Sequence, residues 1–119
     1  MAFATDRPIF LELADSIAAD VLSGLYPEES QVPSTTELAA HYRINPATAG
    51  KALNRLVDAG VVYKKRGLGM FVATGAPEAL KRQRRSEFHA EFIAPLLTEA
   101  GRLGLTPADI VDLITKDQS

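Results

Sequence analysis

The sequence contains no cysteine and no tryptophan. The absence of cysteine excludes disulfide frameworks, thiolate zinc sites and cysteine nucleophiles. No apolar run approaches the roughly 18 residues that a membrane-spanning helix requires. The opening stretch meets Asp6, Arg7 and Glu12 too early to contain the apolar segment of a secretory signal. We therefore expect a cytoplasmic protein with no membrane partner.

Residues that carry catalytic chemistry are also scarce. The two histidines, His41 and His89, lie on separate predicted elements. No carboxylate pair, phosphate-binding loop or serine-centred motif accompanies them. We therefore expect no catalytic residue, no metal site and no cofactor. The length of 119 residues suits one small domain, or one domain with an appended arm.

Charge is distributed unevenly along the chain. The formal net charge is only -2, but binding of a charged partner depends on the local field rather than on the total. Between His41 and Gly69 the only acidic residue is Asp58. The basic residues of that segment are Arg43, Lys51, Arg55, Lys64, Lys65 and Arg66. This segment is the candidate for binding a polyanion.

Three helices are predicted in the first half of the chain. Apolar residues at helical spacing run from Pro8 to a glycine stop at Gly24. A second, short helix follows from Ser34, which forms a capping-box pattern with Glu37, and stops near Arg43. Between the two helices, a short extended piece is expected at Gln31 and Val32. The third helix spans "INPATAGKALNRL", with Asn45 as its cap, Pro46 in its first turn and Gly60 beyond its end. Its inward face is expected to carry Ala49, Ala52, Leu53, Leu56 and Val57.

Two short strands and a helical arm are predicted after the third helix. "VVYKK", "RGLG" and "MFVA" are typical of a β-hairpin with a glycine-bearing turn. From Pro77 to Gly104 a long helical pattern follows, with an expected kink at Pro95 because proline cannot donate to the carbonyl of Glu91. Thr106, Pro107 and Asp109 start a last helix. The fold class is therefore mainly α with a small β-hairpin: a winged helix-turn-helix (residues 1–75) followed by a two-helix C-terminal dimerisation arm (residues 76–119).

The third helix carries small residues where a recognition helix must approach DNA. Its N-terminal end enters the major groove in a helix-turn-helix, so bulky side chains there would hold it away. Ala47, Thr48 and Gly50 fit this requirement, Lys51 is placed to reach a guanine edge or a phosphate, and Arg55 a phosphate. In the wing, Gly67 and Gly69 permit a tight turn, and Lys64, Lys65 and Arg66 supply charge.

Other interpretations of these residues stay open at this point. Gly50 could instead pack against a neighbouring helix, and the wing bases could be a solvated strand end. "KRQRR" at residues 81–85 is better explained as a solvated helix face than as a second nucleic-acid site. Phe88 and Phe92 favour an interface or core over a ligand pocket.

The arm has more apolar surface than two helices can bury by themselves. We expect it to pair with the arm of a second chain, so that the protein is a homodimer that reads an inverted repeat in double-stranded DNA. The dimer interface is predicted to include Phe88, Phe92, Leu96, Ile110, Leu113 and Ile114. Any small-molecule effector would have to bind at the dimer seam, because the arm is too short for a deep pocket of its own.

The stretch "VPSTTELAAHYRINPATAGKALNRLVDAGVVYKKRGLGMFV" resembles the winged-helix domain of GntR-family bacterial transcription regulators. The short tail, with "INPAT" and "MFVATGA", is similar to the YtrA subfamily. The resemblance implies a dimeric repressor, often of a transporter operon, without a large effector domain. By position it implies that Ser34, Thr35 and Thr36 clamp a phosphate, that Lys64 to Gly69 form the wing, and that the recognition helix contacts DNA through Asn45, Ala47, Thr48, Gly50 and Lys51.

Four positions depart from the family pattern: Thr36 replaces the usual arginine, Pro46 and Gly50 replace common arginines, and Leu68 replaces a frequent basic residue. Two rival function classes remain. A winged helix used as a protein-interaction module would expose apolar residues on its third helix, whereas this one presents Lys51, Asn54 and Arg55. An enzyme is the other rival, and it lacks the residues described above.

Overall fold

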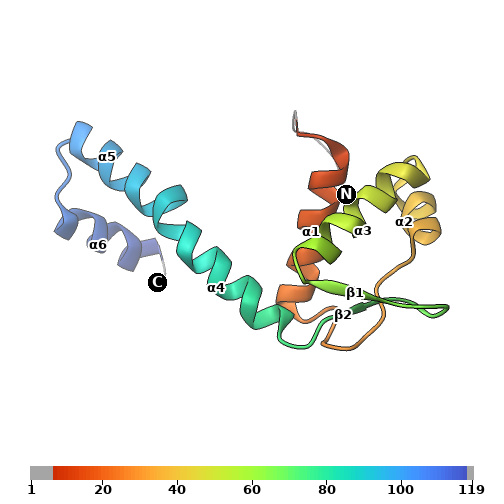
Figure 1. Ribbon diagram of the computed structural model, residues 1–119. Coiled ribbons are helices and arrows are strands. Elements are labelled where there is room, and N and C mark those ends of the chain that lie inside the picture. The colour runs from red at the N-terminus through yellow and green to blue at the C-terminus, as the bar shows by residue number, and fades with distance from the viewer. Residues whose placement is uncertain (1–6, 118–119) are drawn as a thin grey trace. The chain divides into compact units, whose positions relative to one another are not determined.

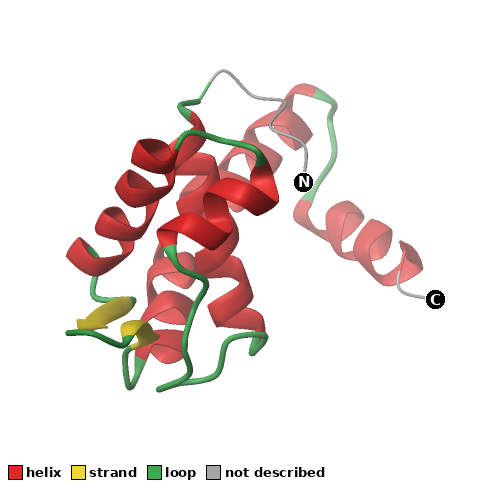
Figure 2. Ribbon diagram, turned by 90° about the vertical axis from the view of Figure 1, so that its right-hand side faces the viewer, coloured by secondary structure: helices red, strands yellow, loops and turns green. Residues whose placement is uncertain are grey.

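The computed structural model describes residues 7–117. The helices and strands follow in the order α1 (Ile9–Ser23), α2 (Thr35–Tyr42), α3 (Pro46–Asp58), β1 (Val62–Lys65), β2 (Gly69–Val72), α4 (Ala76–Phe88), a π-helical turn (His89–Ile93), α5 (Ala94–Arg102) and α6 (Pro107–Asp117) (Figure 1). The chain divides into two compact units, residues 1–81 and 82–119. The predicted fold class, mainly α with one small hairpin, is confirmed (Figure 2).

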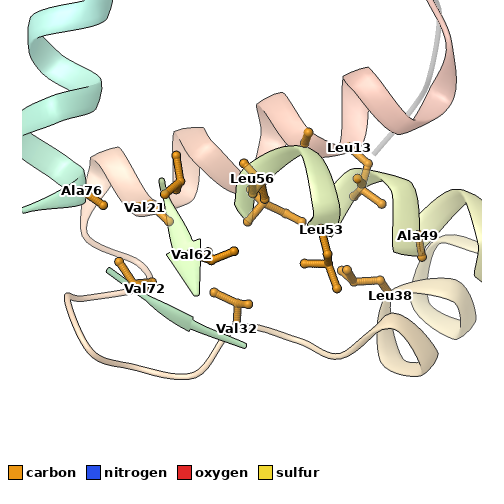
Figure 3. Close-up of a cluster of buried hydrophobic side chains, with 14 of the residues drawn as sticks. Leu13, Val21, Val32, Leu38, Ala49, Leu53, Leu56, Val62, Val72 and Ala76 are labelled. Carbon is orange, nitrogen blue, oxygen red and sulfur yellow. The ribbon is translucent and has the colours of Figure 1, made fainter. Parts of the chain in front are cut away.

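The first unit is a three-helix core closed by the β-hairpin. Helix α3 contacts α1, α2 and β1, and the hairpin pairs Val62 with Val72 at its inner end and Lys65 with Gly69 at its tip. Residues 29–32 run antiparallel along β2, where the N–H of Val32 donates to the carbonyl of Met70 at 3.0 Å. The buried side chains come from all these elements and include Leu13, Val21, Val32, Leu38, Leu53, Leu56, Val62 and Val72 (Figure 3).

The predicted helix boundaries of this unit are confirmed by their capping geometry. Ser34 and Glu37 form the reciprocal capping box, with both hydrogen bonds at 3.1 Å. The side chain of Asn45 accepts from the N–H of Ala47 at 2.7 Å, and Pro46 is the first residue of α3. One inward assignment is wrong, because Val57 is 36% exposed. It lies at the edge of the buried stripe that Ala49, Ala52, Leu53 and Leu56 form.

Helix α4 begins inside the first unit, where Ala76 and Leu80 belong to its buried core. The interruption expected at Pro95 takes the form of a π-helical turn directly before it, in which the N–H of Ala94 donates to the carbonyl of His89. Lengthening the turn by one residue accommodates a proline that has no N–H to donate. Among the described residues of the second unit, only Ala100 and Ile110 are buried. None of the described helices is long and apolar enough to cross a bilayer.

Candidate nucleic-acid interface

Helix α2 offers the first candidate contact with a DNA backbone. In the capping box, the Glu37 carboxylate accepts the N–H of Ser34, and the Ser34 hydroxyl oxygen accepts the N–H of Glu37. The hydroxyl group of Ser34 acts only as an acceptor there, so its hydrogen is available for a further bond. Thr35 and Thr36 occupy the first turn, and the Thr36 side chain is exposed. First-turn N–H groups and the positive end of the helix dipole favour an anion at this position.

The N-terminal end of α3 has the small side chains that a groove-binding helix needs. Ala47 is exposed and Thr48 is half-buried. Asn45 is held in its cap, where its carbonyl accepts from Thr48 and Ala49 at 2.9 and 3.1 Å. Its amide nitrogen is therefore turned away from the cap bond, because the side-chain oxygen accepts from Ala47. This end of α3 therefore combines small side chains with polar groups.

Gly50 faces open space. A Cβ built at this position meets no heavy atom of a neighbouring element within 4 Å. The alternative in which Gly50 is small because a neighbouring helix packs on it is therefore wrong for this fold. The glycine therefore costs helix stability relative to alanine without any packing against a neighbouring element in return.

Lys51 is exposed on α3 and has an aromatic neighbour that sequence reasoning missed. Its Nζ lies 5.9 Å from the ring centroid of Phe10, near the start of α1. A cation at this distance is attracted to the ring face. Phe10 appeared in the sequence only as one more apolar residue of the first helix, so no local pattern could have identified this contact. Arg55 is exposed one turn further along α3.

The wing bases do not share one environment. Lys64 and Arg66 are exposed, whereas Lys65 is half-buried. The Nζ of Lys65 lies 4.2 Å from the ring centroid of Phe71 and 5.8 Å from that of Tyr63. Strand alternation explains the difference, because Tyr63 and Lys65 share one face of β1. Lys65 is therefore held on the aromatic face of the hairpin.

The wing turn needs both of its glycines. Gly67 has φ +80° and Gly69 φ +118°, which are conformations that other residues rarely adopt. The N–H of Leu68 donates to the carbonyl of Lys65 at 2.9 Å and closes the turn. The side-chain amide of Gln31 donates to the carbonyl of Leu68 at 2.8 Å, a contact that no local sequence pattern indicates.

Two acidic residues tie the base of the wing to the start of α4. Glu29 accepts hydrogen bonds from the hydroxyls of Thr74, at 2.6 Å, and of Tyr63. These two bonds lower the pKa of Glu29, and the bond from Thr74 has the larger effect. The bond to Glu29 in turn raises the pKa of Tyr63. Glu28 accepts the N–H of Gly75. The hairpin is therefore anchored at the end away from its turn.

The arm residues predicted for a dimer interface fall into two groups. Five are exposed in the single chain: Phe88 52%, Phe92 59%, Leu96 38%, Leu113 50% and Ile114 52%. The rings of Phe88 and Phe92 contact each other, with centroids 5.7 Å apart. Ile110 differs, because it is only 9% exposed and has little surface left for a partner. Within the part of the chain that is described, no group of three or more metal-ligating side chains is present.

Comparison with known proteins identifies the class of this fold. Residues 10–72 match the family described as "Bacterial regulatory proteins, gntR family". The chain is 24% identical to the uncharacterized HTH-type transcriptional regulator YhcF of Bacillus subtilis, over 92% of this chain and 89% of that protein. It is 29% identical to the histidine utilization repressor of Klebsiella aerogenes over 73% of this chain, but spans only 36% of that longer protein.

Solved structures extend the likeness to the arm and to DNA complexes. A transcriptional regulator from Oenococcus oeni matches with a TM-score of 0.82 at 25% identity, covering 100% of this chain and 98% of that one. The DNA-binding domain of AraR, solved with its operator, matches with a TM-score of 0.56 at 25% identity, covering 61% and 88%. YtrA from Sulfolobus acidocaldarius shares the fold, with a TM-score of 0.56 at 21% identity over 98% and 92%.

These matches agree with the geometry on the same segment. The family match covers the three helices and the hairpin, which are the elements that carry the small-residue helix end and the exposed bases. The family is one of transcription regulators, and the AraR domain with its operator shows the same fold bound to DNA. The chain therefore belongs to the gntR family of bacterial regulatory proteins and is a DNA-binding transcriptional regulator.

Proposed function

We propose that this protein is a sequence-specific repressor that binds an inverted-repeat operator as a homodimer joined through its arm. The observation that carries the proposal is the burial pattern of the arm. In the described residues of the second unit (82–117), only Ala100 and Ile110 are buried, while the aromatic pair and most aliphatic side chains are exposed. Exposed apolar side chains concentrated on one small unit are typical of an interface.

A dimer also explains how a small domain would recognise one operator in a genome. A single winged helix reads one half-site, whereas two copies related by a two-fold axis read half-sites with centres about 34 Å apart, or a multiple of that distance. The repressor names of several relatives support repression as the mode of action, as in the histidine utilization repressor.

We assign the DNA contacts to three places in the first unit. The phosphate clamp is the start of α2, the base-reading surface is the start and exposed face of α3, and the wing supplies further phosphate contacts. The geometry supports this assignment because Gly50 faces open space and Arg55, Lys64 and Arg66 are exposed. The residues are Ser34, Thr35, Thr36, Asn45, Ala47, Thr48, Gly50, Lys51, Arg55, Lys64, Lys65, Arg66, Gly67 and Gly69.

We also place the chain in the YtrA subfamily and in the cytoplasm. The short helical arm supports the subfamily, together with the fold shared with Sulfolobus YtrA over nearly the whole of both chains. We propose a functional division after residue 75, where the wing has ended and α4 is about to begin. The first two turns of α4 nevertheless supply Ala76 and Leu80 to the core of the winged unit.

Oligomeric state and DNA binding, measured on the same samples, test the proposal. Light scattering should give a dimer for the full chain at micromolar concentration, and an intact inverted repeat should bind far more tightly than a half-site. Phe88→Ser with Phe92→Ser should dissociate the dimer and reduce binding to the weak, salt-sensitive level of one winged helix. Leu25→Ser is the matched control, because Leu25 is 64% exposed but lies outside the arm.

A truncation locates the dimer seam. Deleting residues 82–119 removes the second unit, and with it most of the arm, but keeps the buried Leu80 in the first unit. We expect a folded monomer with weak affinity for DNA. A full-length monomer would contradict the proposal, and so would a truncated protein that remains dimeric, because the seam would then lie in the winged unit.

A further inference from the structure

Within the described residues, one side-chain hydrogen bond links the tip of the wing to a segment that is distant in sequence. The strand ladder ends at the pair Lys65 and Gly69, so it does not hold the residues beyond that pair. Gln31, which precedes Leu68 by 37 residues, donates its side-chain amide to the carbonyl of Leu68 at 2.8 Å. Its backbone also forms an isolated antiparallel bridge with Phe71. Gln31 therefore contacts both the returning strand and the turn.

The turn is shaped to receive this side chain. A Cβ at Gly69 would lie 2.6 Å from Nε2 of Gln31, which is too close for any real contact. Gly69 thus leaves the space through which the glutamine reaches Leu68. At Gly67 a Cβ would meet nothing within 4 Å. The positive φ angle accounts for glycine at both positions. At Gly69 the absence of a Cβ also makes room for the side chain of Gln31.

We infer that Gln31 is a positioning residue for DNA binding, which holds the wing tip so that Arg66 meets a phosphate in a preformed arrangement. The inference rests on the proposed contact between the wing and DNA. A turn with two glycines has large conformational freedom, and ordering it on binding would reduce affinity. The hydrogen bond to Leu68 removes part of that freedom in the free protein.

Gln31→Met tests the inference, because methionine keeps the length and neutrality of the side chain and removes the donor. Loss of one such bond should weaken DNA binding about two- to tenfold. In the free protein, the ¹⁵N order parameters of the tip amides, Gly67 to Gly69, should fall. The melting temperature should stay close to that of the wild type, because Gln31 is exposed. Gln83→Met is the matched control, since Gln83 is exposed on α4 and bonds only weakly to Glu87 at 3.4 Å.

A double-mutant cycle with Arg66→Ala separates positioning from direct contact. If Gln31 acts through the tip, Gln31→Met should cost less affinity once Arg66 is absent. Full additivity of the two losses would overturn the inference, because Gln31 would then act independently of the tip. Unchanged order parameters or unchanged affinity in Gln31→Met would also overturn it. If Arg66→Ala alone leaves both affinity and salt dependence unchanged, the proposed contact between wing and DNA is itself wrong.

Discussion

Replacing Gly50 separates the requirements of folding from those of DNA binding. A Cβ at this position meets nothing within 4 Å, so Gly50→Ala introduces no clash. Alanine in a helix interior is more favourable than glycine by about 1 kcal/mol. For a unit of this size, that gain raises the melting temperature by about 4–8 °C. Gly50→Leu should gain nearly as much, because leucine is also a strong helix former.

The effect on DNA binding should be opposite in sign. A leucine side chain on the exposed face of α3 would hold the helix away from the base edges, so the specific mode of binding should be lost. Specific binding by such proteins exceeds non-specific binding by about 10³-fold or more. The affinity for a DNA fragment from upstream of the protein's own gene should therefore fall to the value for random DNA of the same length.

Circular dichroism melting and fluorescence anisotropy on the same variant provide both measurements. Gly101 supplies the control, because it is also a helical glycine whose Cβ would meet nothing within 4 Å. Gly101→Leu should stabilise its helix and leave specific binding in place. A Gly50→Leu protein that melts below the wild type would refute the reasoning about open space. A stable Gly50→Leu protein with unchanged specific affinity would refute the role of close approach.

Three further perturbations follow from contacts of the first unit. Lys64→Ala should lower the log–log salt slope of binding by about 0.9, whereas Lys65→Ala should lower it less, because its ammonium group lies over Phe71; titrations at several salt concentrations that give equal slopes would contradict this. Phe10→Leu should free Lys51 and weaken binding to the upstream fragment about two- to fivefold while leaving random DNA unaffected, and an equal loss on both DNAs in a competition assay would argue against it. The pKa of Glu29 is lowered from its ordinary value of 4.5, so its contribution to stability is complete above that value and is lost as the pH falls through the folded pKa. Glu29→Gln should show a weaker decline in melting temperature as the pH falls below 4.5, and parallel curves would contradict this.

Much of the first unit could be predicted because its signals are local. Capping boxes, a proline at a helix start and a glycine after a helix end each act within a few residues. Ser34 with Glu37, and Asn45 with Pro46, define two helix starts in this way, and both are found as expected. Helical spacing also placed the buried face of α3, apart from Val57 at its margin.

The remaining features depend on neighbours that are distant in sequence. Three contacts form only after the chain has folded: those between Gln31 and Leu68, Phe10 and Lys51, and Glu29 and Tyr63. No periodicity contains such pairings. In the arm, helical spacing could not separate Ile110, which is buried, from Leu113 and Ile114, which are exposed. Pro95 predicted an interruption, but its form depends on how the preceding residues rearrange their hydrogen bonds.

The π-helical turn before Pro95 lets the arm absorb a change in chain length. A residue added to a continuous α-helix turns everything beyond it by about 100°, whereas a π turn takes up the additional residue by widening. Deleting one residue between His89 and Ile93 would let this segment become α-helical. The aliphatic residues beyond it would then keep nearly the same direction relative to Phe88. Relatives that differ by one residue here would therefore present a similar combination of side chains to a partner arm.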